Sequence, residues 1–182
     1  RTPPPKTLFP YTTLFRSIEA LAMAASNFIG QNIGARNVER VKKGKSLSMK
    51  ICVGMTVLIG GLIMIFKTPI LHAFTTDSEV VKYGSQFIMF IVPLYFIYAM
   101  NQILSGVLRG AGKTFVPMLI GLVCMCGFRV GWLVVMMGIV KDVRIIYASY
   151  PLTWILTNIA MTAYYYKSSW IKKTTLEAVE TV

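Results

Sequence analysis

Charged residues are scarce in this sequence of 182 residues. They make up 14% of it, against about 25% in an average soluble domain, while hydrophobic residues make up 55% and the mean hydropathy is +0.61. So few charges cannot cover a water-exposed surface. The composition therefore excludes a disordered chain and an ordinary soluble enzyme, and it favours a membrane protein.

Residues that carry chemistry are scarce as well. The three cysteines, Cys52, Cys124 and Cys126, all lie in apolar stretches and are too few for a disulfide framework. The single histidine, His72, has no cysteine or carboxylate at metal-ligand spacing, and the GAGKT sequence at 110–114 lacks the first glycine of a nucleotide-binding loop. We therefore expect this chain not to be an enzyme, with no catalytic residue, no metal site and no cofactor site.

Long apolar runs are the main feature of the sequence. A helix rises about 1.5 Å per residue, so about 20 residues cross a hydrocarbon layer of about 30 Å. Because the runs are uniformly apolar rather than alternating, helices fit them and the strands of a barrel do not. The sequence predicts an all-α, polytopic transmembrane helical bundle, with complete spans at about 46–66, 83–108, 116–140 and 145–166 and a partial span at 18–30.

The first 17 residues do not continue this pattern. The run Pro3-Pro4-Pro5 cannot be helical, and neither the apolar core nor the cleavage site of a signal peptide is found. The stretch 7–17 (TLFPYTTLFRS) resembles a one-frame translation of the end of a common DNA-sequencing adapter. We therefore expect residues 1–17 to be a foreign or disordered segment and the sequence from residue 18 to be the tail of a longer protein. The alternative is a genuine cytoplasmic arm.

Signals for the beginnings of helices lie in the links between the runs. Asn37 can cap the helix that leads into the first complete span, and the segment 76–79 (TDSE) has the spacing of a capping box, so a helix should begin near Asp77. Thr114 can cap the next helix, whose first turn tolerates Pro117.

The net charge of +12 is distributed unevenly. When alternate links are placed on opposite sides of a membrane, most cations fall on one side, which holds Arg36, Arg40, Lys42, Lys43, Lys45, Lys50, Arg109, Lys113, Lys167, Lys172 and Lys173, whereas the other holds Lys67, Lys82, Lys141 and Arg144. Positive charge stays cytoplasmic. We therefore expect the first group and the polar tail 174–182 in the cytoplasm, and we expect no binding of nucleic acid.

One charge lies inside a complete span, away from its ends. Arg129 is the fourteenth of the 25 residues from 116 to 140, near the middle of the membrane. A central arginine costs about 2.5–3.5 kcal/mol on insertion, so its side chain should face protein or water and find an acceptor. Arg129 is a candidate for the substrate or transport path or, equally, a structural residue bonded to a neighbouring helix.

A few uncharged polar residues also lie in the spans. Asn101 and Gln102 are adjacent, while Trp154, Asn158 and Thr162 follow one another at i, i+4 and i+8 and therefore share one helix face. Such residues can line a cavity, or they can form hydrogen bonds across a helix contact at about 0.6 kcal/mol each, which is the favoured interpretation. Three of them, Asn101, Gln102 and Asn158, join Arg129 as transport-path candidates.

Several segments resemble those of a known family. The segments 30–43 (GQNIGARNVERVKK) and 104–114 (LSGVLRGAGKT), the latter followed by Pro117, resemble two cytoplasmic links of the multidrug and toxic compound extrusion (MATE) family. Arg129 and the segment 150–156 (YPLTWIL) resemble the closing part of its second bundle. The resemblance covers residues 18–173.

This resemblance implies a secondary active transporter. MATE proteins consist of two six-helix bundles around a central cavity, and they export cationic or amphipathic compounds by Na⁺ or H⁺ antiport with alternating access. This chain would be part of the C-terminal bundle, in the inner (plasma) membrane of a bacterium. Its partners would be the lipid bilayer, the N-terminal bundle of the same protein and small cationic or amphipathic substrates. We expect no coupling carboxylate in the membrane-embedded segments between residues 18 and 166, so the ligands of the coupling ion are expected outside this chain.

Two other functions fit the same residues. A flippase for lipid-linked sugars shares the two-bundle plan and would use Arg129 to bind phosphate. A non-transporting membrane scaffold would use the polar residues only for helix packing. A carboxylate opposite Arg129 would favour the antiporter, further cations there would favour the flippase, and a polar set without a cavity would favour the scaffold.

Overall fold

The computed structural model describes residues 10–73, 75–139 and 144–167. All regular structure within these residues is helical, as predicted. The elements are α1 (Pro10–Gly34), α2 (Val38–Ile65), α3 (Lys67–His72), α4 (Ser78–Ile91), η1 (Val92–Leu94), α5 (Tyr95–Gly110), α6 (Phe115–Gly121), η2 (Leu122–Phe128), α7 (Arg129–Ile139) and α8 (Arg144–Lys167). The η1 segment is a turn of 3-10 helix, and η2 is a π-helix.

Three helical segments among the described residues are long and apolar enough to cross a membrane, namely 38–65, 78–110 and 115–139. They contain the first three predicted spans, except that residue 66 follows the end of α2 and residue 140 is outside the described part. The last predicted span, 145–166, corresponds to α8. At 24 residues this helix is long enough to cross, but its hydroxyl, amide and tyrosine side chains make it less apolar.

Helix α1 extends beyond the partial span predicted at 18–30. It begins at Pro10 and thus includes part of the segment predicted to be foreign or disordered. Leu14 and Ile18 are almost completely buried and belong to the same core as Ile29. The foreign origin of residues 1–17 stays a prediction, and residues 1–9 lie outside the described part of the chain.

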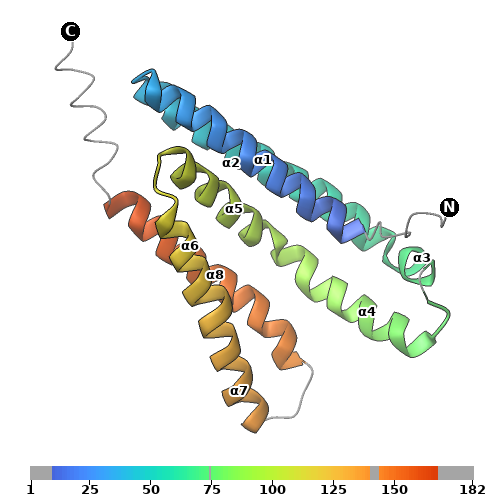
Figure 1. Cartoon of the computed structure of the whole chain (residues 1–182). Helices are drawn as coiled ribbons and strands as arrows, with labels where there is room; N and C mark the ends of the chain where they lie inside the picture. Colours follow the sequence, from blue (N-terminus) through green and yellow to red (C-terminus); the bar gives the residue numbers. More distant parts are fainter. Residues whose placement is uncertain (1–9, 74, 140–143, 168–182) are drawn as a thin grey trace, which may run out of the picture.

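Helix α5 is the centre of the arrangement. It packs against α1 and α2 on one side and against α8 on another, and residues 103–108 are all buried. Figure 1 shows α1 and α2 side by side, with α4 and α5 forming one long arm next to them and α6, α7 and α8 beyond α5. The core is therefore a set of contacts between helices that lie far apart in the sequence.

Two glycines allow the close contact between α5 and α1. Gly106 and Gly110 lie one helical turn apart, and a Cβ atom at either position would collide with the main-chain oxygen of Ala22 or Ser26 on α1. Small residues four apart let two helix backbones approach closely in membranes. The local sequence of α5 therefore determines which face of this helix meets α1.

The predicted cap at Asn37 and the predicted beginning of a helix near Asp77 are observed, although the second cap is Asp77 itself and not Thr76, the first residue of the predicted capping box. Asn37 Oδ1 accepts a hydrogen bond of 3.0 Å from the Arg40 main-chain nitrogen, and Asp77 Oδ1 accepts one of 2.9 Å from that of Glu79. The prediction that Thr114 caps its helix is wrong. Its φ of −73° and ψ of −33° are helical, whereas a capping side chain acts from an extended residue.

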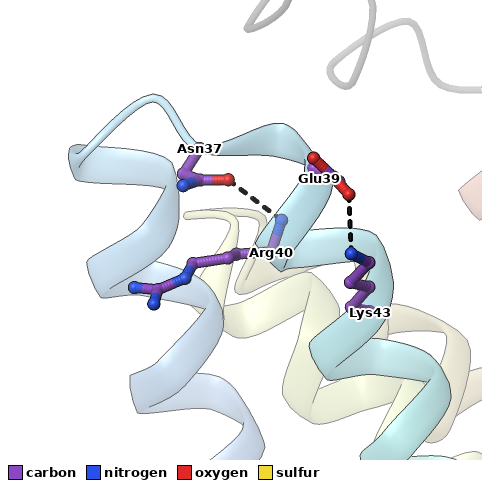
Figure 2. A network of polar contacts seen from close by, with 4 residues as sticks. All are labelled: Asn37, Glu39, Arg40 and Lys43. Atoms are coloured by element: carbon purple, nitrogen blue, oxygen red, sulfur yellow. Dashed lines mark hydrogen bonds and ion pairs between the residues drawn. The ribbon is translucent and has the colours of Figure 1, made fainter.

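The cation-rich links gather at one end of the bundle. Figure 1 places the α1–α2 link, the α5–α6 link and the C-terminal end of α8 at this end. Figure 2 shows the beginning of α2 there, with the Asn37 cap and an exposed ion pair of 2.6 Å between Lys43 and Glu39. The grouping agrees with the predicted charge asymmetry for the described cations, whereas Lys141, Lys172 and Lys173 lie outside the described residues. The side of the membrane on which this end lies stays a prediction.

Candidate functional site

Arg129 is the first residue of α7, and its side chain reaches α8. Its Nη2 donates a hydrogen bond of 2.8 Å to Thr153 Oγ1, and its guanidinium carbon lies 4.3 Å from the centre of the Tyr150 ring. An arginine over an aromatic face gains a cation–π attraction. Arg129 therefore contacts a neighbouring helix, which both interpretations of this residue allow.

The contacts with α8 satisfy the guanidinium only in part. An arginine has five N–H donors, and the Nε of Arg129 is buried without a hydrogen-bond partner. The indole nitrogen of Trp132 is buried without a partner as well. The two residues are three apart on one helix and therefore share a face. This part of α7 holds two buried N–H donors without an acceptor among the described residues.

The π-helix η2 sets the direction of both side chains. A π-helix closes its hydrogen bonds over five residues instead of four, so seven residues of it, from Leu122 to Phe128, change the angular position of everything that follows. Arg129 begins directly after this segment. The direction of Arg129 toward α8 therefore depends on η2.

Asn101 lies at the contact between α5 and α8. Its side chain is only 1% exposed, and its Nδ2 donates a hydrogen bond of 2.9 Å to the main-chain oxygen of Trp154. Its Oδ1 is buried without a partner. Asn101 thus connects α5 to α8 through a hydrogen bond, and its Oδ1 accepts no hydrogen bond from the described residues.

Asn158 lies at the same contact, whereas Gln102 does not bridge it. Asn158 Nδ2 donates a long hydrogen bond of 3.4 Å to the main-chain oxygen of Ile97, and Thr162 Oγ1 donates one of 3.3 Å to Asn158 Oδ1. Gln102 Nε2 donates to the hydroxyl of Tyr98 within α5. The structure therefore brings Asn101 and Asn158 to one helix contact, while Gln102 is bonded within its own helix.

An open groove of about 530 Å³ also lies between α5 and α8. Its lining is mostly apolar and consists of Ile97, Met100, Ile155, Asn158, Ile159, Thr162 and Ala163. A second open groove, of about 500 Å³, lies where α4 begins and includes Asp77 and Glu79. Of the four predicted transport-path residues, only Asn158 lines either groove.

The first residue of the predicted stripe, Trp154, belongs to an aromatic cluster. Its ring centre lies 5.5 Å from that of Tyr95 and 5.5 Å from that of Tyr98, and the two tyrosine rings are 5.2 Å apart. Trp154 is 5% exposed, so it packs in the core. The stripe therefore combines helix packing and cavity lining, because Trp154 packs in the core whereas Asn158 and Thr162 line the groove.

Glu19 is the polar residue that the sequence interpretation missed. The expectation that no membrane-embedded segment between residues 18 and 166 holds a coupling carboxylate overlooks Glu19, which lies in the partial span 18–30 and on α1. Glu19 lies on α1 and is exposed, and α1 packs against α5, where the Tyr98 ring stacks on Phe15 of α1 at 5.7 Å between ring centres. The signal was the carboxylate within the apolar segment 18–30, because ionisable residues in such segments are rare and usually functional.

The described residues form an all-helical bundle with several helices of membrane length, and cation-rich links join these helices at one end. The third long helical segment contains an arginine. These features define a multi-pass integral membrane protein. The MatE family model matches residues 10–135, which is more than half of the chain. This chain therefore belongs to the MATE family, which is a family of transporters and not of enzymes.

Two relatives from different kingdoms illustrate the similarity. The chain is 26% identical over 159 residues to "Probable multidrug resistance protein YoeA" of Bacillus subtilis, a match that covers 85% of this chain and 33% of that protein. It is 33% identical over 103 residues to "Multidrug and toxin extrusion protein 1" of Danio rerio, which covers 57% of this chain and 17% of that protein. The chain thus spans at most about a third of the length of these relatives.

Two solved structures have the same fold. The eukaryotic MATE transporter AtDTX14 superposes with a TM-score of 0.79 at 18% identity, covering 92% of this chain and 38% of that chain. The inward-facing conformation of a multidrug resistance MATE family transporter of the MOP superfamily gives a TM-score of 0.77 at 19% identity, covering 93% and 42%. The predicted family and fold class are confirmed.

Proposed function

We propose that this chain is part of a secondary active transporter that exports cationic or amphipathic compounds by antiport with Na⁺ or H⁺. The observation that carries the proposal is the match of the MatE family model over residues 10–135. The fold shared with two MATE structures supports it. In this proposal the chain belongs to one of two bundles around a central cavity, and its partners are the other bundle, the lipid bilayer and the transported compound.

Alternating access requires helices that bend or rock, and the long helices of this chain have defined breaks. Pro93 lies in the 3-10 turn η1 between α4 and α5, and the π-helix η2 interrupts the third apolar segment. Breaks of these kinds are common causes of helix bending. We place the transport path along α5 and α8, where Asn158 lines the groove, Asn101 and Gln102 lie behind it on α5, and Arg129 reaches α8 from α7.

Glu19 is the carboxylate that we propose for the coupling cation. It is fifteen residues before Gly34, which corresponds to about 22 Å along α1 from the cation-rich end. A carboxylate at such a depth in an apolar helix can bind Na⁺ or exchange a proton. We also propose that the cation-rich end faces the cytoplasm, in the inner membrane of a bacterium.

The test is efflux from cells that express the complete reading frame to which this chain belongs. We expect lower accumulation of ethidium and norfloxacin than in cells with an empty vector, and we expect the difference to disappear when the Na⁺ or the proton gradient is abolished. The same accumulation as in vector cells, at a verified membrane level of the protein, would contradict the proposal.

Two matched variants test the role of Glu19. Glu19→Gln should abolish the gradient-dependent part of efflux, because the amide carries no charge and exchanges no proton. Glu39→Gln is the control, since Glu39 is an exposed residue at the beginning of α2 that pairs only with Lys43. Efflux that survives Glu19→Gln unchanged would remove Glu19 from the coupling site.

Unchanged efflux in Arg129→Ala, at an unchanged membrane level, would likewise remove Arg129 from the path.

A further inference from the structure

The two unused N–H donors of α7 point to a ligand. We infer that Arg129 and Trp132 together bind a carboxylate group, which in a transporter would belong to the transported compound. The inference rests on the proposed function only for the source of that carboxylate. The binding site itself follows from the contacts of α7 with α8.

The charge of Arg129 lacks a counterion nearby. Its contacts on α8 are the neutral hydroxyl of Thr153 and the ring of Tyr150. The described elements that surround it, η2, α7 and α8, contain no Asp or Glu. An arginine near the middle of a membrane span is costly without a counterion, so the binding of an anion there is favoured because it neutralises the charge.

Arg129 and Trp132 each have an N–H donor for which their partners among the described residues supply no acceptor. Thr153 Oγ1 donates its own proton to the main-chain oxygen of Tyr150 at 2.8 Å, so it can accept from Arg129 but cannot also donate to an anion. The donors without a partner among the described residues are the Nε of Arg129 and the indole nitrogen of Trp132. Arg129 is partly exposed, so a ligand can approach the guanidinium.

These donors fit a carboxylate better than a phosphate group. A carboxylate is planar and singly charged, and its two oxygens match the parallel N–H groups of a guanidinium. It neutralises the single positive charge of Arg129. A doubly charged phosphate would leave excess negative charge between apolar helices, with a further oxygen for which the described residues of this site offer few donors.

The indole nitrogen of Trp132 supplies a direct readout of binding. The full chain of 182 residues, labelled with ¹⁵N-tryptophan and held in detergent micelles, gives indole signals that can be assigned by Trp132→Phe and Trp154→Phe. We expect sodium benzoate to shift the Trp132 signal saturably, because its carboxylate accepts the indole proton. Benzamide is the neutral control of the same shape and should cause no saturable shift. The Trp154 signal should not move, since Trp154 lies in the aromatic core.

Three further arms decide the identity of the site. Arg129→Gln should abolish the saturable shift, and Arg129→Lys should weaken benzoate at least about tenfold, because lysine cannot form the paired hydrogen bonds. Short-chain phosphatidylglycerol micelles test a lipid phosphate as the alternative acceptor. A saturable shift of Trp132 with the lipid and none with benzoate would overturn the carboxylate assignment.

The remaining outcomes decide whether Trp132 responds to a negative charge or to an aromatic ring. Equal shifts with benzoate and benzamide, or a benzoate shift that persists in Arg129→Gln, would show that Trp132 responds to an aromatic ring rather than to charge, and either result would overturn the proposal. If Arg129→Gln fails to fold by circular dichroism, the Arg129→Lys comparison carries the decision. The assay needs no transport, so its failure is distinguishable from a failure of the efflux experiment.

Discussion

Asn101 of α5 and Trp154 of α8 are joined by a hydrogen bond of 2.9 Å from the Asn101 amide to the Trp154 main-chain oxygen. Both residues are in the core, at 1% and 5% exposure. Helix α5 otherwise packs against α1 and α2, whereas α8 packs against α7 and η2. This bond therefore lies in the contact that connects two groups of helices.

The bond between Asn101 and Trp154 predicts losses of stability of different size for two substitutions of Asn101. Asn101→Asp keeps the size but removes the donor and adds a buried charge, so we expect a loss of at least about 2 kcal/mol. Asn101→Leu also removes the unpaired Oδ1, so the loss should stay within about 1 kcal/mol. The measurement is thermal or SDS-induced unfolding in detergent, followed by circular dichroism. Gln102→Glu is the matched control, and an equal effect of both acidic variants would contradict the role of Asn101.

The glycines of α5 give a second prediction about stability. Gly106→Ala and Gly110→Ala place a methyl group against the backbone of α1, and overpacking of this kind costs about 1–3 kcal/mol. Gly138→Ala is the control, because a Cβ atom there meets nothing within 4 Å. We expect a lower unfolding midpoint for the two α5 variants and no loss for the control. Equal midpoints for all three variants would show that α1 and α5 do not pack through these glycines.

The features that could be predicted from the sequence are those decided by neighbouring residues. The cap at Asn37 and the beginning of a helix near Asp77 depend on residues two or three positions apart, and both are observed, although Asp77 rather than Thr76 supplies the second cap. The apolar runs depend on composition alone, and they predict the helices closely. Thr114 does not cap its helix because its own backbone is helical. The residue type alone does not reveal this backbone conformation.

The partners of the transport-path candidates could not be predicted, because they depend on rotation of one helix against another. A regular helix through 115–139 would give Arg129 one direction, and the π-helix η2 gives it another. Asn101 and Asn158 both bond across the contact between α5 and α8, while two glycines on another side of α5 pack against α1. Packing of this kind is a property of the whole bundle.

Lys45 gives a prediction about the cation-rich end. Its ammonium group lies 3.5 Å from the centre of the Tyr165 ring and 5.4 Å from that of Tyr166, so it connects α2 to the last turns of α8. Lys45→Met keeps the apolar stem and removes the charge, and we expect a loss of about 0.5–2 kcal/mol in unfolding experiments. Lys43→Met should cost less than about 0.5 kcal/mol, because its ion pair with Glu39 is exposed. A larger effect at position 43 than at position 45 would contradict this assignment.

The placement of the cation-rich end in the cytoplasm can be tested on two exposed links. Lys113 lies in the α5–α6 link at that end, and Thr76 lies in the segment before α4, at the opposite end of the bundle (Figure 1). In a background without the native cysteines, a membrane-impermeant maleimide added to intact spheroplasts should label Thr76→Cys at once. It should label Lys113→Cys only after permeabilisation, because links rich in lysine and arginine are retained in the cytoplasm. Both positions are exposed, so a difference in labelling reports the side of the membrane rather than burial. Immediate labelling of Lys113→Cys would place the cation-rich end outside the cell and reverse the proposed orientation.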